Sequence, residues 1–260
     1  MQMILRCFAA AALVFALFSA EPSFAEEKKS ILITGASTGI GRNLAETLAG
    51  MGHHVYAGAR KDEDLAELDA IDNITAVRLD VTKQEQIDAV VALIKEKGTG
   101  LYGLVNNAGV GAGGPVLEAS IEDTQFVYAV NVEGVYRTTK AFAPLVIESK
   151  GRIATTGSIA GVRSGPGWST YAGSKHWMEA FADSLAGEME PLGVHASIIE
   201  PGSYQSNIRR SGWKRAFENI EAGGGEITDE MKQAYEATAA RELSFKEPDD
   251  VSAAFVHALF

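Results

Sequence analysis

Apolar runs of strand length alternate with helical patterns along most of the chain. Between the third and fourth runs, Ile87, Val90, Val91 and Ile94 recur at the spacing that places them on one face of a helix. Strands that alternate with amphipathic helices predict an α/β fold, a doubly wound parallel sheet with helices on both faces in three layers. The runs occupy residues 31–34, 54–59, 75–79, 102–106, 152–157 and 195–200.

One segment interrupts this alternation. Residues 202–247 contain no strand-like run, but they carry Trp213, Phe217 and Tyr235. A long aromatic insertion after a strand end predicts a lid over a ligand site, and the alternative is a surface excursion whose aromatics pack locally. The chain then ends at Phe260 inside an amphipathic helical pattern. No linker divides residues 26–260, so we expect one domain there.

The first 25 residues have a different composition. Arg6 precedes the apolar run "CFAAAALVFALF", and small residues at Ser23 and Ala25 precede the charged "EEKKS". This order is typical of a secretory signal peptide and predicts export, periplasmic or secreted, with cleavage after Ala25. An uncleaved anchor, which alone would bring membrane contact, and a misplaced start codon, which would leave a cytoplasmic protein, are the alternatives.

Size, charge and cysteine content restrict the possible functions. With 260 residues, 46% of them hydrophobic, the chain is long enough for one large α/β domain. Its formal charge of −11 disfavours nucleic acid as a partner, because an acidic surface repels phosphate backbones. Cys7 is the single cysteine, which excludes an intramolecular disulfide and a cysteine-based metal site, and we expect no metal.

Glycines mark a candidate phosphate site at "TGASTGIG". Gly35, Gly39 and Gly41 follow the first strand and precede a helical pattern. Such a turn lets a dinucleotide pyrophosphate approach the backbone and the positive end of the helix. The better textual match to the dinucleotide fingerprint, in "GVGAGG" (109–114), is followed by Pro115 and opens no helix, so we interpret it as a loop.

The end of the second strand bears on cofactor choice. Arg60 stands where a carboxylate would bind the ribose hydroxyls of NAD, and an arginine suits the 2′-phosphate of NADP. Arg42 offers a second positive charge. Asp62 and Asp64 lie nearby and leave NAD(H) possible, and an exposed surface charge is the alternative role for Arg60.

A tyrosine and a lysine supply candidate acid–base chemistry. Tyr171 and Lys175 stand at i and i+4, on one face of a helix. A nearby ammonium group favours the phenolate and lowers a tyrosine pKa, which makes the hydroxyl a usable acid or base. Ser158, just past the fifth strand, is placed to steady the same substrate oxygen.

The chain contains a second Tyr-x-x-x-Lys pair, Tyr136 and Lys140. The position that corresponds to Ser158 is occupied by Asp123, so this pair lacks the supporting hydroxyl. We interpret Tyr136 as an aromatic that faces the core from a long helix.

In order and spacing, these motifs resemble the short-chain dehydrogenase/reductase family from about residue 30 to residue 260. The resemblance rests on "TGASTGIG", "LDVT" (79–82), "NNAG" (106–109), "NVEG" (131–134), "GSIAG" (157–161), "YAGSK" (171–175) and "PG" (201–202). It implies a single Rossmann-type domain and an NAD(P)-dependent oxidoreductase that acts on CH–OH groups. It also implies a homodimer or homotetramer.

The resemblance assigns roles to individual residues. Tyr171 would be the acid/base, Ser158 would orient the substrate oxygen, and Lys175 would lower the tyrosine pKa and hold the ribose. Asn131 would support a water that relays protons to the lysine. Together with Arg60, the expected cofactor-binding residues are Gly35, Ser37, Thr38, Gly39, Ile40, Gly41, Asp80, Val81, Asn107, Ala108, Gly109, Tyr171, Lys175, Pro201, Gly202 and Ser206.

Within the family, "VYAGAR", "GLVNNAG" and "IEPG" are similar to hydroxysteroid and retinol dehydrogenases. The expected function is therefore hydride transfer between NADP(H) and a hydrophobic alcohol, ketone or aldehyde that is steroid-, retinoid- or lipid-like. Alternatives are a catalytically idle dinucleotide-binding or scaffold protein, and a sugar-nucleotide epimerase or dehydratase. Two departures from the family pattern are Ser206, where threonine is usual, and a last strand that is apparently missing.

Overall fold

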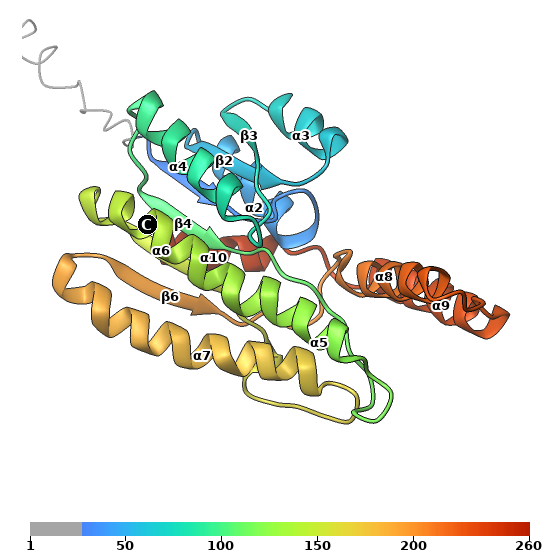
Figure 1. The fold of residues 1–260 in the computed structure, drawn as a ribbon. Helices are drawn as coiled ribbons and strands as arrows, with labels where there is room; N and C mark the ends of the chain where they lie inside the picture. The colour runs from blue at the N-terminus through green and yellow to red at the C-terminus, as the bar shows by residue number, and fades with distance from the viewer. Residues whose placement is uncertain (1–27) are drawn as a thin grey trace, which may run out of the picture.

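The computed structural model describes residues 28–260, so the predicted signal peptide lies outside the described residues. Within them, a central sheet is covered by helices on both faces (Figure 1). None of the helices in this range is long and apolar enough to cross a membrane.

Six parallel strands form the sheet, in the order β3-β2-β1-β4-β5-β6. This order reverses between β1 and β4, as in a doubly wound fold, and confirms the predicted fold class. Each strand lies within about one residue of its predicted position. The strands are β1 (Ser30–Ile33), β2 (His54–Ala59), β3 (Ile74–Arg78), β4 (Gly103–Asn106), β5 (Arg152–Thr156) and β6 (His195–Ile199).

The first strand shows why the sheet forms. Ile31 and Ile33 point to one face and pack into one hydrophobic core, while Leu32 points to the other face and packs into a second core. All three side chains are fully buried. A strand buried on both faces explains the continuous apolar run in the sequence.

The helices divide between the two cores. Leu44 of α2 and Phe255 of α10 belong to the core of one face, whereas Phe142 of α6 and Leu185 of α7 belong to the other. The helices are α2 (Gly39–Gly50), α3 (Asp62–Asp69), α4 (Gln84–Lys97), α5 (Ile121–Tyr128), α6 (Val135–Glu148), α7 (Ser169–Met189), α8 (Ile208–Ala222), α9 (Asp229–Leu243) and α10 (Asp249–Leu259).

Residues 202–247 fold as a helical hairpin of α8 and α9 that projects from the rest of the molecule (Figure 1). Trp213, Phe217 and Tyr235 pack on one another, with ring centroids 5.7 and 5.8 Å apart, and the Trp213 indole donates to Thr238 Oγ1 at 3.2 Å. No residue of α8 is buried. The aromatic side chains therefore hold the two helices together.

The two edge strands of the sheet are β3 and β6. Among residues 28–260, β6 pairs with β5 and with no other strand. The last helix, α10, packs against α2 and beside β5 and β6. It corresponds to the amphipathic pattern seen at the end of the sequence.

Candidate active site

A cavity of about 610 Å³ opens where the carboxyl ends of the six strands meet. Segments that follow every strand line it, as expected for a ligand site at the reversal of strand order. Of the predicted catalytic and cofactor residues, the lining includes Gly35, Ser37, Thr38, Gly39, Ile40, Gly41, Arg60, Asp80, Val81, Asn107, Ala108, Gly109, Ser158, Tyr171, Lys175, Pro201, Gly202 and Ser206. Only Asn131 lies outside the lining.

The glycine turn has no room for a side chain at Gly35 or Gly41. Gly35 has a φ of +66°, and a Cβ there would lie 2.8 Å from Ala108 Cα. At Gly41 a Cβ would lie 2.4 Å from Asn107 Nδ2 and equally close to the Gly35 carbonyl oxygen. The turn then leads directly into α2, which begins at Gly39. Residues 37–41 at this helix start line the cavity, and a helix N-terminus offers unpaired backbone N–H groups, which fits a bound pyrophosphate.

Asn107 braces the turn from the neighbouring strand. Its Nδ2 donates to the carbonyl oxygens of Thr34 and Gly35, at 3.1 and 3.0 Å, and its Oδ1 accepts from Thr156 Oγ1 at 3.1 Å. Thr34 in turn accepts from the backbone N–H groups of Asn107 and Ala108. The ends of β1, β4 and β5 are thus tied together beneath the cavity.

Tyr171, Lys175 and Ser158 converge at the other end of the cavity. Lys175 is 4% exposed, and its Nζ donates to the Thr156 carbonyl oxygen at 2.7 Å and lies 5.8 Å from the Tyr171 ring centroid. The Ser158 hydroxyl lies close enough to that of Tyr171 to favour its ionised form. Its Oγ also accepts from the Ala160 N–H, which fixes the serine at the start of a short helical turn.

Burial shifts the pKa values of both Tyr171 and Lys175. Burial raises the pKa of Tyr171, although the Ser158 hydroxyl and the charge of Arg209 act in the opposite direction. Burial also lowers the pKa of Lys175 to about 8, against the raising effect of Glu179. The net shift of the Tyr171 pKa is therefore upward, because desolvation outweighs the nearby charges, and the lowering expected from Lys175 stays a prediction.

Two predicted residues use their side chains to hold backbone segments beside the cavity. Asn131 is fully buried in a π-helical turn (Ala129–Gly134), and its amide exchanges hydrogen bonds of 2.9 Å with both backbone groups of Val110. The Asp80 carboxylate accepts from the backbone N–H and Oγ1 of Thr82, at 2.9 and 2.7 Å. Both side chains hold loops that border the cavity.

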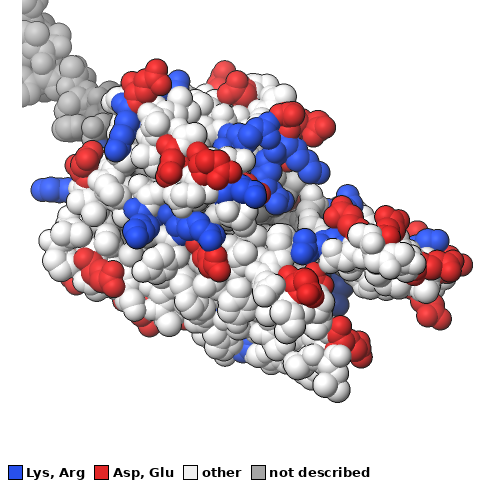
Figure 2. Space-filling model, in the orientation of Figure 1, with Lys and Arg blue, Asp and Glu red and all other residues white. Residues whose placement is uncertain are grey.

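Arg60 and Arg42, the two basic residues expected near the ribose, border different cavities in the structure. Arg60 lines the cavity, and among residues 28–260 no acidic side chain forms an ion pair with it. Arg78 donates to the Arg60 carbonyl oxygen at 2.6 Å and forms an ion pair with the exposed carboxylate of Asp62. Figure 2 shows Lys and Arg side chains gathered where α3 lies. Asp64 remains in the lining.

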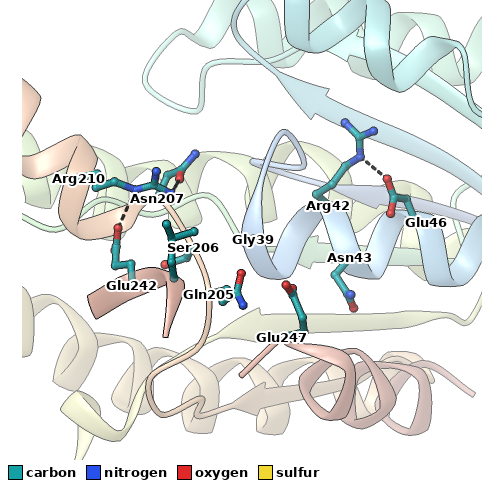
Figure 3. Close-up of a pocket in the computed structure, with 11 residues that line it drawn as sticks. Gly39, Arg42, Asn43, Glu46, Gln205, Ser206, Asn207, Arg210, Glu242 and Glu247 are labelled. Carbon is teal, nitrogen blue, oxygen red and sulfur yellow. Dashed lines mark hydrogen bonds and ion pairs between the residues drawn. The ribbon is translucent and has the colours of Figure 1, made fainter. Parts of the chain in front are cut away.

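Arg42 does not line the large cavity. It pairs with Glu46 at 2.5 Å and with Glu67 at 3.7 Å, and it borders a smaller cavity of about 250 Å³ (Figure 3). The expected contribution of Arg42 to cofactor charge is thus not supported by its position.

Glu242 anchors the helical hairpin beside this smaller cavity. The carboxylate is 1% exposed, accepts from the Arg209 backbone N–H at 2.9 Å and from Arg210 Nε at 3.0 Å. Figure 3 shows Glu242 and Arg210 meeting from α9 and α8. A carboxylate at the first turn of α8 also interacts favourably with the positive end of the helix dipole.

Of the two rejected motifs, the second tyrosine–lysine pair lies outside the cavity lining, whereas residues 109–113 of the second glycine pattern belong to it. Tyr136 is 57% exposed on the outer face of α6, and Lys140 is exposed as well. The prediction of a core-facing Tyr136 is therefore wrong, because the inner face of α6 is occupied by its aliphatic and Phe142 side chains. The second glycine pattern lies in a loop that opens no helix before Ile121, although Gly109 and Gly111 border the cavity.

Arg209 and Thr156 were not identified from the sequence. Both line the cavity near Tyr171, one from the first turn of α8 and one from the end of β5. Thr156 acts through its backbone carbonyl, which no side-chain pattern reveals. Among residues 28–260, no group of three or more His, Cys, Asp or Glu side chains is arranged to hold a metal ion.

The family model described as short chain dehydrogenase matches residues 29–216. D-beta-hydroxybutyrate dehydrogenase, mitochondrial, of Mus musculus is 39% identical over 186 residues, covering 68% of this chain and 54% of that protein. Retinol dehydrogenase 7 of Rattus norvegicus is 36% identical over 214 residues, covering 80% of this chain and 67% of that protein. The chain thus spans about half the length of the first of these curated relatives.

Solved structures of short chain dehydrogenases are similar in fold to this chain. A short chain dehydrogenase/reductase from Burkholderia phymatum in complex with NAD has a TM-score of 0.78 and 28% identity, with 90% of this chain and 86% of that chain covered. A closed form of serine dehydrogenase complexed with NADP+ has a TM-score of 0.75 and 27% identity, with 87% of each chain covered. The chain belongs to the short chain dehydrogenase family.

Proposed function

We propose that this protein is an NADP(H)-dependent oxidoreductase that moves a hydride between the nicotinamide and an apolar alcohol or carbonyl compound. The observation that carries the proposal is the convergence of Ser158 and Lys175 on Tyr171, in the same cavity as a glycine turn that admits no side chain. A dinucleotide cofactor fits this arrangement, since its pyrophosphate needs close backbone approach.

The bound cofactor would supply or accept the hydride. The Tyr171 hydroxyl gives its proton to the carbonyl oxygen during reduction and accepts one from the alcohol during oxidation. Ser158 holds that oxygen, and a protonated Lys175 favours the phenolate that remains after proton transfer. Burial excludes water from Lys175, so its charge acts in a medium of low dielectric constant.

The position of Arg60 favours NADP over NAD as the cofactor. Arg60 borders the cavity after β2 and has no ion-pair partner among the described residues, while Asp62 is paired with Arg78. A free guanidinium at this position suits the 2′-phosphate of NADP.

The substrate end of the cavity supports an apolar substrate. Ile159 and Trp168 line it and are 40% and 48% exposed, and Val162, 68% exposed, follows on the same loop. The two relatives are named for D-beta-hydroxybutyrate and for retinol. Those names include both a small hydroxy acid and a large apolar alcohol, and the exposed apolar loop supports an apolar body.

A Tyr171→Phe variant tests the mechanism. Assayed on a panel of ketones and aldehydes through the absorbance of reduced nicotinamide, its turnover is expected to fall by about 10²-fold or more, because the proton donor is lost. Cofactor binding should remain. Tyr136→Phe, in the exposed pair, is the control and should keep full activity. Full turnover by Tyr171→Phe would refute the mechanism.

Titrating Arg60→Gln with NADPH and NADH tests cofactor preference. Removing a phosphate-binding charge should weaken NADPH binding by about tenfold or more and leave NADH binding nearly unchanged. Lys95→Gln, an exposed lysine on α4, is the matched charge control. If the wild type binds NADH more tightly than NADPH, Arg60 does not have the proposed role.

A further inference from the structure

Arg209 is a cation at the substrate end of the cavity. It belongs to the first turn of α8 and lines the same cavity as Ser158 and Tyr171. Its positive charge acts on the Tyr171 hydroxyl, whose pKa it lowers against the effect of burial. A group held beside Tyr171 for reaction therefore lies within the electrostatic reach of Arg209.

The Arg209 guanidinium is held in place, and the carboxylate beside it is shared with a second arginine. Nη2 donates to Ser203 Oγ at 3.3 Å, and the guanidinium lies 5.1 Å from the Phe245 ring centroid. Its nearest carboxylate oxygen, Glu242 Oε1, is 4.0 Å from Nη1 and accepts from the Arg209 backbone N–H, while Oε2 accepts from Arg210. Arg209 and Arg210 thus share one buried carboxylate, so the three charged groups together keep a net positive charge.

Charges along the cavity are distributed unevenly. The acidic lining residues are Asp64 and Asp80, which follow β2 and β3 at the end expected to hold adenosine. The lining segments 109–113, 156–171 and 201–211 contain no acidic residue. Around Tyr171 the lining therefore combines cationic and apolar side chains, an arrangement that attracts an anion attached to an apolar body.

We propose that Arg209 binds a carboxylate of the substrate, so that the protein acts on an apolar hydroxy acid or oxo acid. This inference rests on the proposed function, since it places the reacting carbonyl at Tyr171. A planar guanidinium forms paired hydrogen bonds with a carboxylate, and those bonds fix the distance between the acid group and the reacting carbon. Arg209 would act as a substrate-binding residue that selects acids over neutral ketones and alcohols.

The test uses straight-chain oxo acids in which the ketone stands progressively further from the carboxylate, each paired with its methyl ester. Reduction rates with NADPH are measured, and so is binding of each compound to the protein saturated with NADP. At the best separation, kcat/KM and affinity for the acid should exceed those for the ester by about tenfold or more. Arg209→Gln should remove this preference, so that each acid and its ester are reduced with similar kcat/KM and bound with similar affinity.

Arg241→Gln is the matched control. Arg241 is exposed on α9 and also approaches the Phe245 ring, at 5.9 Å, but it does not line the cavity. It should retain the acid preference. The affinity of Arg209→Gln for NADPH is measured separately, because an arginine that binds cofactor phosphate would weaken NADPH rather than discriminate acid from ester.

The outcomes separate this inference from the proposed function. Turnover of ketones without acid preference overturns the role of Arg209 and leaves the oxidoreductase intact. Acid-selective binding that depends on Arg209, without any turnover, supports the anion site and refutes the oxidoreductase. A weakened NADPH affinity with unchanged acid preference in Arg209→Gln, or no acid that binds better than its ester, overturns the inference.

Discussion

At the scale of single residues, the buried ammonium group of Lys175 is the least favourable feature of the site. It is 4% exposed and donates to the Thr156 carbonyl oxygen and, at 3.4 Å, to Met178 Sδ. A carbonyl and a thioether replace water poorly around a charge, and this is why burial lowers the pKa to about 8. Removing water makes the lysine effective beside Tyr171 and costs stability when it is protonated.

The lowered pKa of Lys175 predicts that the cofactor-free protein gains stability from about pH 8 to about pH 10.5. In this window the unfolded lysine still binds its proton and the folded one has lost it, so raising the pH favours the folded state. The gain is at most about 3 kcal/mol in the free energy of unfolding. Urea unfolding from pH 7 to pH 10 measures it.

In Lys175→Met the pH-dependent gain should disappear. Lys140→Met removes an exposed lysine and should keep the wild-type pH dependence. If Lys175→Met follows the wild-type curve across the same pH range, its ammonium group is not destabilised by burial.

At the scale of elements, glycine has opposite effects on stability in a turn and in a helix. Gly35 has a positive φ and stands against Ala108, so the turn between β1 and α2 depends on the absence of a side chain. Gly187 is in the last turns of α7, where a Cβ would meet no atom within 4 Å. There glycine only weakens the helix, because it loses more backbone freedom on folding than alanine does.

Gly35→Ala and Gly187→Ala form a matched pair. Gly35→Ala should lower the free energy of unfolding by about 1–3 kcal/mol through backbone strain and overpacking, and it should abolish NADPH binding. Gly187→Ala should raise it by about 0.5–1 kcal/mol and leave binding unchanged. Thermal or urea unfolding and the fluorescence of NADPH measure both effects. Normal cofactor affinity in Gly35→Ala would contradict the role assigned to the turn.

At the scale of the whole molecule, the sheet domain and the α8–α9 hairpin have different energetic bases. The domain buries two apolar cores, whereas α8 buries no residue and α9 buries only Glu242. The hairpin is attached by polar contacts, including Arg215 to Asp123 at 3.2 Å. Partly exposed ion pairs of this kind contribute about 1 kcal/mol or less.

Replacing residues 214–237 with a short Gly/Ser linker should therefore leave the domain folded. Trp213 and Thr238 are in hydrogen-bond contact, so the linker has little distance to cover. We expect the free energy of unfolding to change by about 1 kcal/mol or less and NADPH affinity to be retained, since the lining ends at Ser211. Urea unfolding and an NADPH titration test this. Loss of the cooperative transition would show that the hairpin belongs to the core.

Local patterns predicted much of this arrangement because parallel strands buried on both faces must be apolar and a phosphate turn must be rich in glycine. They also placed Tyr171 and Lys175 on one helical face. Patterns failed for Tyr136, whose spacing fits either face of α6. They did not give the net direction of the Tyr171 pKa shift, which depends on how completely the side chain is buried. Patterns also predicted an aromatic lid, which stays a prediction; in the structure Trp213, Phe217 and Tyr235 pack on one another within the hairpin.

The sequence alone determined the order of strands and helices, the glycine turn, the tyrosine–lysine pair and, with them, the family. Each of these depends on residues that are close along the chain or that recur with a fixed period. Only the tertiary structure placed Arg209 and Tyr171 in the lining of one cavity. It also paired Asp62 with Arg78 and buried Glu242 at the first turn of α8. These arrangements join residues from separate elements, and their electrostatics depend on burial, which no local pattern encodes.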